Sequence, residues 1–224
     1  MTAIADAQSP LVSVSRPPAG AADGLMVLMH GRGTSEQDLA GLFDLLDSER
    51  RLHLAAPRGP LQIPGAPGNH WYVVPRVGHP DPDTFTRSYE LLGEWLERLA
   101  EETGIGPDRT VLGGFSQGTV MAYALGLGAG RPVPAGILAL SGFIPQLSGW
   151  APSLEERRGL PVLISHGERD PVIPVSFAHE ARDQLEPAGL AVTYREAPIG
   201  HWIDGPTVDA AGDWLETALP RQPL

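Results

Sequence analysis

The stretch that decides the fold of this chain is Thr110-Val-Leu-Gly-Gly-Phe-Ser116-Gln-Gly-Thr-Val-Met-Ala-Tyr-Ala-Leu125. It begins with an apolar run that contains Val111 and Leu112 and continues into two glycines, as expected for a buried strand of a parallel sheet. The apolar residues of 120–125 suit a helix that packs back on that sheet. The stretch therefore predicts a strand, a tight turn and a helix.

The turn itself, Gly114-Phe-Ser-Gln-Gly118, fits the G-x-S-x-G pattern of a nucleophile elbow. In an elbow the serine occupies a strained turn above the sheet, and the flanking glycines let strand and helix approach closely. Three fixed positions in five form a weak pattern in a chain with 27 glycines, so a Gly-rich turn without chemistry is the alternative. The predicted strand before and helix after the turn favour the elbow. Ser116 is therefore the candidate nucleophile.

Length and composition limit the fold and the partners. With 224 residues the chain fits a single α/β domain, which we place at residues 11–220 after a loose N-terminus, residues 1–10. The net charge of −11 is spread without a basic block, which argues against binding to nucleic acid or to an anionic membrane. The chain has no cysteine, so thiolate metal sites, disulfides and a cysteine nucleophile are excluded.

The sequence also carries expectations about location. The first 24 residues lack the charged region, apolar stretch and cleavage site of a signal peptide. No later segment approaches the roughly 20 consecutive apolar residues of a membrane span. We therefore expect a cytoplasmic protein without integral membrane association.

Strand and helix patterns alternate along the chain. A half-exposed edge strand is expected at 11–15, and further strands are expected at 25–29, 52–57, 136–140, 161–165 and 191–194. Helical spacing follows a capping-box signal at Thr34 and Gln37, and recurs at 85–99, 174–188 and 208–219. This alternation predicts a mostly parallel sheet with helices on both faces. Between them, residues 58–83 read as a long ordered loop anchored by Trp71 and Tyr72.

A serine hydroxyl is a weak nucleophile near neutral pH, so it needs a base that is itself oriented by a third group. His201 follows a strand and precedes a helix, which lets it reach across the top of the sheet, and we take it as the base. His179 lies inside the 174–188 helix beside its apolar stripe, where packing explains it better. His166 precedes every good acid candidate, against the usual order of serine, acid and histidine.

The acid is expected in the loop that follows strand 161–165. Asp170 is the first choice, although an aspartate before a proline is also common in plain turns. Glu168, two residues nearer the strand, is the alternative. Asp204 follows His201 and is better explained as the cap of the last helix.

An oxyanion needs preorganised N–H donors. In this type of site one comes from the residue after the nucleophile and the other from an early strand-to-helix loop, which here gives Gln117 and Arg32. The side chain of Arg32 has two further readings, binding of an acidic substrate group or pairing with Glu36.

Several motifs together resemble one family. The motifs are His30-Gly-Arg-Gly33, Ser35-Glu-Gln-Asp-Leu39, Ala56-Pro-Arg-Gly-Pro60, Gly114-Phe-Ser-Gln-Gly118, Leu140-Ser-Gly-Phe143, His166-Gly-Glu-Arg-Asp-Pro-Val-Ile-Pro174 and Gly200-His201. They occur in the family's order over roughly residues 10–220, and the resemblance is to the carboxylesterase/phospholipase family of α/β-hydrolases, which includes the acyl-protein thioesterases. Arg32 stands where the eukaryotic thioesterases usually carry leucine, so small bacterial carboxylesterases are more similar.

The resemblance implies an α/β-hydrolase fold with little or no lid, no metal or other cofactor, and a triad of Ser116, Asp170 and His201. Its members act on carboxylic esters and thioesters and often form dimers, so a homodimer is compatible with it. We expect a serine carboxylesterase acting on short-chain, small-molecule esters. The alternatives are an acyl-protein thioesterase or lysophospholipase, and a non-catalytic ligand-binding protein of the same fold. Five residues are candidates for the pocket wall: Trp71, Tyr72, Phe143, Ile144 and Trp202.

Overall fold

The computed structural model describes residues 2–4 and 11–222, and its centre is a mostly parallel sheet of eight strands. In their order across the sheet these are β1 (Thr2–Ile4), β2 (Ser13–Arg16), β4 (Leu52–Pro57), β3 (Gly24–Met29), β7 (Thr110–Phe115), β8 (Gly136–Leu140), β9 (Pro161–Gly167) and β10 (Ala191–Ala197). Neighbours from β4 to β10 run parallel, whereas β2 is antiparallel to both β1 and β4. The predicted α/β-hydrolase fold is confirmed.

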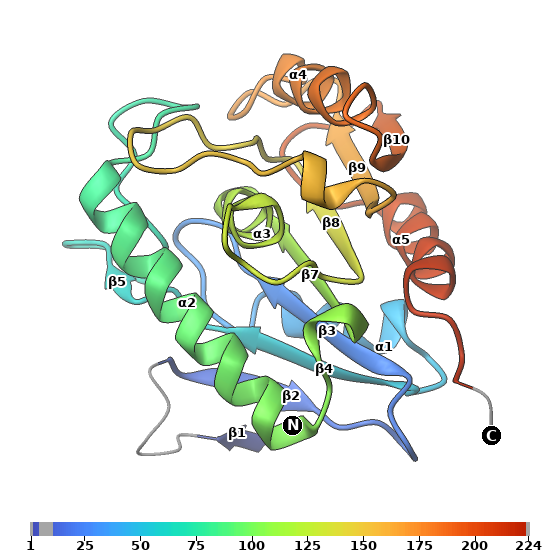
Figure 1. Ribbon diagram of the computed structural model, residues 1–224. Helices are drawn as coiled ribbons and strands as arrows, with labels where there is room; N and C mark the ends of the chain where they lie inside the picture. The colour runs from blue at the N-terminus through green and yellow to red at the C-terminus, as the bar shows by residue number, and fades with distance from the viewer. Residues whose placement is uncertain (1, 5–10, 223–224) are drawn as a thin grey trace.

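Helices cover both faces of this sheet (Figure 1). They are α1 (Phe43–Leu46), α2 (Pro82–Thr103), α3 (Gln117–Leu127), α4 (Ser176–Leu185) and α5 (Gly205–Ala218), with short 3-10 turns at η1 (Leu39–Leu42), η2 (Pro107–Arg109) and η3 (Glu155–Arg157). One apolar core joins α2, α3 and α4 to the sheet, and a second joins α1 and α5 to the other face. Every residue of α3 is buried, which fits a sequence that is apolar on all sides apart from Gln117 and Thr119.

The N-terminal region differs from expectation in two ways. Thr2–Ile4, inside the expected loose terminus 1–10, pairs with β2 as strand β1, while residues 1 and 5–10 lie outside the described residues. The edge strand expected at 11–15 is strand β2 at 13–16, and it is flanked on both sides. Pairing with β1 satisfies backbone groups that an edge strand leaves open.

The first helix is much shorter than its apolar spacing predicts. The capping box does not form, because the hydroxyl of Thr34 donates to the carbonyl of Gly31 and the N–H of Gln37 bonds to the hydroxyl of Ser35. Helical structure starts only at Leu39, in η1. These local bonds compete with a helix start and hold the segment after β3 as an irregular loop.

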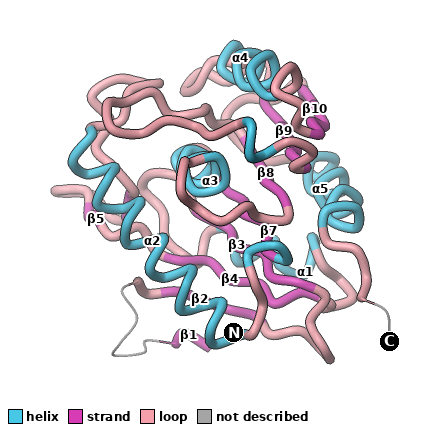
Figure 2. Tube along the Cα trace, viewed as in Figure 1, coloured by secondary structure: helices cyan, strands magenta, loops and turns pink. Residues whose placement is uncertain are grey.

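The long segment between β4 and α2 is ordered, as expected, although it is mostly loop (Figure 2). It contains one short hairpin, β5 (Leu61–Gln62) paired with β6 (Asn69–His70). Beyond the hairpin, Asp81 accepts a hydrogen bond from the N–H of Thr84 at 3.0 Å and caps α2. The helix ends at Gly104, where φ is 68°.

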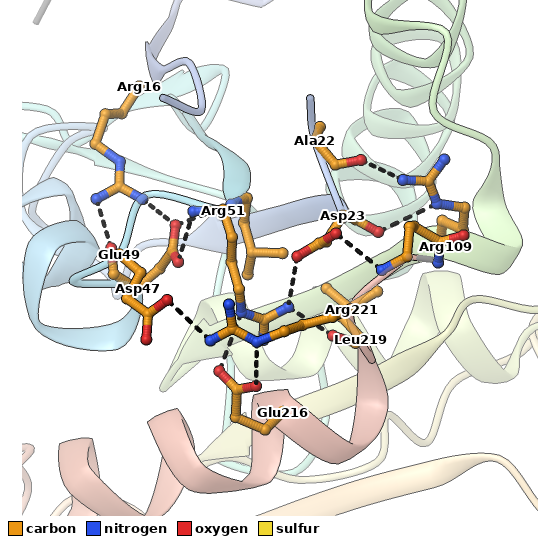
Figure 3. A network of polar contacts seen from close by, with 12 residues as sticks. Arg16, Ala22, Asp23, Asp47, Glu49, Arg51, Arg109, Glu216, Leu219 and Arg221 are labelled. Atoms are coloured by element: carbon orange, nitrogen blue, oxygen red, sulfur yellow. Dashed lines mark hydrogen bonds and ion pairs between the residues drawn. The ribbon is translucent and has the colours of Figure 1, made fainter. Parts of the chain in front are cut away.

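A network of arginines ties the chain together at the amino ends of the strands (Figure 3). Arg51 donates to Glu216 of α5 at 3.0 Å and to the carbonyl of Leu219 at 2.6 Å, and it lies 3.7 Å from Asp23. Arg16 binds Asp47 on the loop before β4. These contacts join β2, α5 and the segments before β3 and β4 at the edge of the sheet opposite Ser116, where they stabilise the fold.

Candidate active site

The turn after β7 has the strain expected of an elbow. Ser116 has φ 56° and ψ −119°, a backbone conformation that a residue with a side chain rarely adopts. The two neighbouring glycines make it sterically feasible. A Cβ on Gly118 would overlap the carbonyl of Met29, and one on Gly114 would overlap the backbone of Gly118. Ser116 thus stands between β7 and α3 with its Oγ at the carboxyl edge of the sheet.

Two residues from other loops meet Ser116 there. Nε2 of His201 lies 2.9 Å from Oγ of Ser116, and Nδ1 of His201 lies 2.6 Å from Oδ2 of Asp170. The carboxylate oxygen of Asp170 accepts a hydrogen bond from Nδ1–H of His201. Nε2 of His201 is then unprotonated and can accept a hydrogen bond from the hydroxyl of Ser116.

Asp170 is itself fixed in place. Its Oδ1 accepts hydrogen bonds from the backbone N–H groups of Val172 and Ile173, both at 2.8 Å. Its side chain is fully buried in the loop between β9 and α4. The loop therefore presents one carboxylate oxygen to His201 and holds the other with its own backbone.

The sequence-based alternatives lie elsewhere. Glu168 is exposed. His179 pairs with Glu196 at 2.7 Å on the outside of α4 and β10. Asp204 accepts from the N–H of Thr207 at 2.9 Å and caps α5, as expected.

His166 was set aside by the order argument, yet the structure places it against Asp170. Its Nε2 lies 2.8 Å from the carbonyl oxygen of Ile173 and 3.4 Å from Oδ2 of Asp170. Burial lowers the pKa of His166, so the ring is neutral near pH 7 and Nε2–H donates to Ile173. Its position near the end of β9, four residues before Asp170, is the signal that could have identified it.

On the other side of Ser116 lies the loop after β3. A Cβ on Gly31 would lie 3.5 Å from Cβ of Ser116, so the peptide that joins Gly31 to Arg32 is next to the serine. Among the described residues, the backbone N–H groups of Arg32 and Gln117 have no hydrogen-bond partner. Both are therefore available to a group that binds beside Ser116.

Several contacts hold this loop rigid. The N–H of Gly59 donates to Nε2 of His30 at 2.9 Å, and the indole of Trp71 donates to the carbonyl of His30 at 2.9 Å. Burial lowers the pKa of His30, which keeps its ring neutral. The side chain of Gln117 accepts from the N–H of Trp71 at 2.9 Å and donates to the carbonyl of Tyr72 at 2.7 Å. The segment 69–72 thus braces both sides of the serine.

The sequence as a whole decides the family, because residues 12–219 match the Phospholipase/Carboxylesterase family. The chain belongs to that family. It is 26% identical over 223 residues to acyl-protein thioesterase 1 of Gibberella zeae, a match that covers 91% of this chain and 94% of that protein.

Solved structures of esterases share the architecture. Esterase PE8 is 31% identical, with a TM-score of 0.79, over 93% of this chain and 99% of that one. The Bacillus cereus carboxylesterase is 24% identical, with a TM-score of 0.83, over 95% of this chain and 96% of that one. At 24% identity, the similarity to the Bacillus cereus carboxylesterase shows only that the two chains share a fold.

The residues expected to wall the pocket of this family member separate into two groups. Trp71 and Tyr72 are almost completely buried, and Phe143 and Ile144 belong to the same apolar core, so core packing accounts for all four. Trp202 is 56% exposed. Trp71 and Tyr72 are therefore core residues that hold Gln117 and His30 in place, and the assignment of the five residues to a pocket wall stays a prediction.

Two absences hold for the described part of this family member. Within residues 2–4 and 11–222, no group of three or more histidine, aspartate or glutamate side chains is arranged to hold a metal ion. Over the same residues, no helix combines the length and the apolar character needed to cross a bilayer.

Proposed function

We propose that this member of the phospholipase/carboxylesterase family is a serine carboxylesterase that hydrolyses short-chain esters through an acyl-enzyme. The observation that carries the proposal is the continuous contact from Oγ of Ser116 through His201 to Asp170, with distances of 2.9 and 2.6 Å. Nucleophile, base and orienting acid within hydrogen-bond reach are what activation of a serine requires.

In the first half of the proposed reaction, Oγ of Ser116 attacks the ester carbonyl carbon while its proton passes to Nε2 of His201. The carbonyl oxygen becomes an oxyanion, which the N–H groups of Arg32 and Gln117 receive. The tetrahedral intermediate then collapses, the bond to the alcohol oxygen breaks, and His201 gives its proton to that oxygen. The alcohol leaves and the acyl group stays on Ser116.

In the second half, water takes the place of the alcohol. His201 accepts a proton from the water as its oxygen attacks the acyl carbon, and a second oxyanion forms in the same place. When this intermediate collapses, Oγ of Ser116 leaves and regains its proton from His201. The carboxylic acid is released, and Asp170 orients and stabilises the protonated imidazole in both halves.

The preference for short esters follows from the walls available. Residues 58–83 and 143–159 are the segments long enough to wall a pocket, and they are rich in proline and glycine. Of their large aromatic residues, Trp71, Tyr72 and Phe143 are already packed in the core, and Trp150 is partly buried against it. Each buried methylene stabilises a bound chain by about 0.8 kcal/mol, so kcat/KM should stop rising where the apolar wall ends, at roughly two to six acyl carbons.

A fluorophosphonate probe with a nitrophenyl ester series tests the proposal. We expect covalent labelling at Ser116, located by peptide mass spectrometry, and kcat/KM that peaks at a short acyl chain. Absence of both labelling and ester hydrolysis would instead favour a non-catalytic ligand-binding protein.

Acyl-protein thioesterase or lysophospholipase activity is the second candidate. It is favoured by the relative from Gibberella zeae, which carries the name acyl-protein thioesterase 1. If kcat/KM keeps rising to long acyl chains below the aggregation limit of the substrate, or if a long-chain thioester or a lysolipid is preferred to a short ester, this candidate replaces the first. A cytoplasmic location and a homodimer stay predictions, which cell fractionation and light scattering would test.

A further inference from the structure

The proposed hydrolysis uses the backbone of Arg32 and leaves its side chain without a role. That side chain is exposed and belongs to the loop residue next to Gly31, where an added Cβ would lie 3.5 Å from Cβ of Ser116. An arginine side chain extends about 6–7 Å from its Cα, an estimate from standard bond lengths. Its guanidinium can therefore reach a group that is bound beside the serine hydroxyl.

No acidic side chain of the described residues neutralises this guanidinium. Glu36, the acidic residue suggested by the sequence as its partner, is instead bound by two nitrogens of Arg58, each at 2.6 Å. That pairing lowers the pKa of Glu36, so its carboxylate stays ionised and engaged with Arg58 near pH 7. Arg32 itself forms no hydrogen bond or ion pair within the described residues, in a chain whose net charge is −11.

The positive charge of Arg32 affects the pKa of a neighbouring buried side chain. His70, on β6, is 6% exposed, and burial together with the positive charge of Arg32 lowers the pKa of its ring. His70 is therefore neutral near pH 7 and gives Arg32 no counter-charge. The neighbouring imidazole is thus neutral, and the carboxylate of Glu36 is already paired with Arg58.

The backbone on either side of Arg32 is fixed while the side chain is free. The N–H of Gly33 donates to the carbonyl of Asn69 at 2.8 Å, and the N–H of Asn69 donates to the carbonyl of Thr34 at 2.7 Å. Before Arg32, the carbonyl of Gly31 accepts from the hydroxyl of Thr34 at 3.0 Å. A cation on a rigid support, next to the serine, loses little backbone freedom when it binds an anion.

We propose that Arg32 determines substrate choice by binding a carboxylate that the ester carries in addition to the bond that is cleaved. The planar guanidinium matches a carboxylate with two parallel N–H donors. This role of Arg32 in substrate choice rests on the proposed esterase function and adds to it the class of substrate, an ester that carries a carboxylate. The carboxylate belongs either to the acyl part or to the alcohol part, and the test distinguishes the two.

The test uses two matched pairs of esters. In the acyl pair, mono-4-nitrophenyl glutarate is compared with its terminal amide, which has the same shape and no charge. In the alcohol pair, 4-carboxyphenyl butyrate is compared with 4-carbamoylphenyl butyrate. The ratio of kcat/KM for the acid to that for the amide is measured in each pair, so any effect on the oxyanion N–H groups cancels within the ratio.

We expect a ratio of about 10 to 100 in one pair, from the usual strength of hydrogen bonds to charged groups. Arg32→Gln should bring that ratio close to one, and Arg32→Lys should keep part of it, since the charge stays while the paired donors are lost. Arg98→Gln is the matched control, because it removes another exposed arginine, towards the carboxyl end of α2. It should keep the wild-type ratio. Added salt should lower that ratio, because exposed charges are screened.

Binding to the Ser116→Ala protein tests the inference without turnover. Calorimetry with the same esters should show tighter binding of the acid than of the amide, and Arg32→Gln added to Ser116→Ala should abolish that difference. Equal dissociation constants in both pairs, or a preference for the acid that survives Arg32→Gln, would overturn the inference. If the acid binds more tightly but no ester is hydrolysed by the wild type, the role of Arg32 stands and the proposed function fails.

Discussion

Nδ1 of His201 lies 2.6 Å from Oδ2 of Asp170, across two loops that are 31 residues apart in the chain. Glu168 belongs to the same loop as Asp170 but is exposed. The contact with His201 thus distinguishes Asp170 from Glu168, two acids that the sequence could rank only by their position in the loop.

We therefore expect Asp170→Asn to lower kcat by about 10³- to 10⁴-fold, because an amide at this place favours the wrong tautomer of the histidine. Glu168→Gln is the matched control in the same loop and should change kcat less than about threefold, in line with surface substitutions. Steady-state kinetics of both variants on a short nitrophenyl ester checks the ranking. A larger loss in Glu168→Gln would move the orienting acid to Glu168.

Stability should depend on pH through buried histidines, of which His30 and His166 are the most deeply buried. Burial lowers the pKa of His30 and His166 below the ordinary value of 6.5. Between 6.5 and the lower folded value, the unfolded chain binds more protons than the folded one. The stability that these histidines contribute should therefore be fully present above pH 6.5, and the free energy of unfolding should fall as the pH is lowered below that value.

Urea unfolding between pH 7.5 and 5.5 measures this effect. His166→Asn should reduce the slope of the unfolding free energy against pH, whatever its effect on absolute stability. His79→Asn, on the exposed loop before α2, is the control and should leave the slope unchanged. A wild-type protein equally stable across this range would show that the histidines do not titrate as described.

Arg157 should be a large contributor to stability. It is 1% exposed, and its guanidinium donates to the carbonyls of Gly126, Gly128 and Arg131 at 2.8–2.9 Å. It thereby fastens the loop after β8 to the end of α3. Arg157→Met leaves three carbonyls without this donor and should lower the free energy of unfolding by about 3 kcal/mol or more.

Arg158→Met is its neighbouring control, since Arg158 is exposed. It should change the unfolding free energy by less than about 0.5 kcal/mol. Chemical denaturation of the two variants side by side decides the matter. Similar values for both would mean that water replaces the guanidinium without cost.

Much of the fold was predictable because its signals are local. The apolar runs that became β3, β4, β7 and β8 are short and bounded by glycine or proline, and Asp204 with Pro206 marks the start of α5. The first helix was not predictable in this way. Its spacing is helical, but side-chain bonds of Thr34 and Ser35 hold the preceding loop, and such competition depends on tertiary placement.

The candidate site likewise has features that could be predicted from the sequence and features that depend on tertiary placement. The loops that carry Ser116, Asp170 and His201 follow strands, so their convergence at one edge of the sheet could be anticipated. The contact of His166 with the Asp170 loop depends on how that loop turns back on β9. The burial of Trp71 and Tyr72 likewise depends on the path of segment 58–83, for which the sequence has no periodic signal.

The most direct test of the account is kcat/KM of Ser116→Ala on a short nitrophenyl ester, with circular dichroism and unfolding measured on the same samples. Loss of a nucleophile from a working triad costs about 10⁴-fold or more in rate. We predict a loss of that size in a variant that stays folded. A folded Ser116→Ala protein that keeps most of the wild-type kcat/KM would contradict the assignment of Ser116 as the nucleophile.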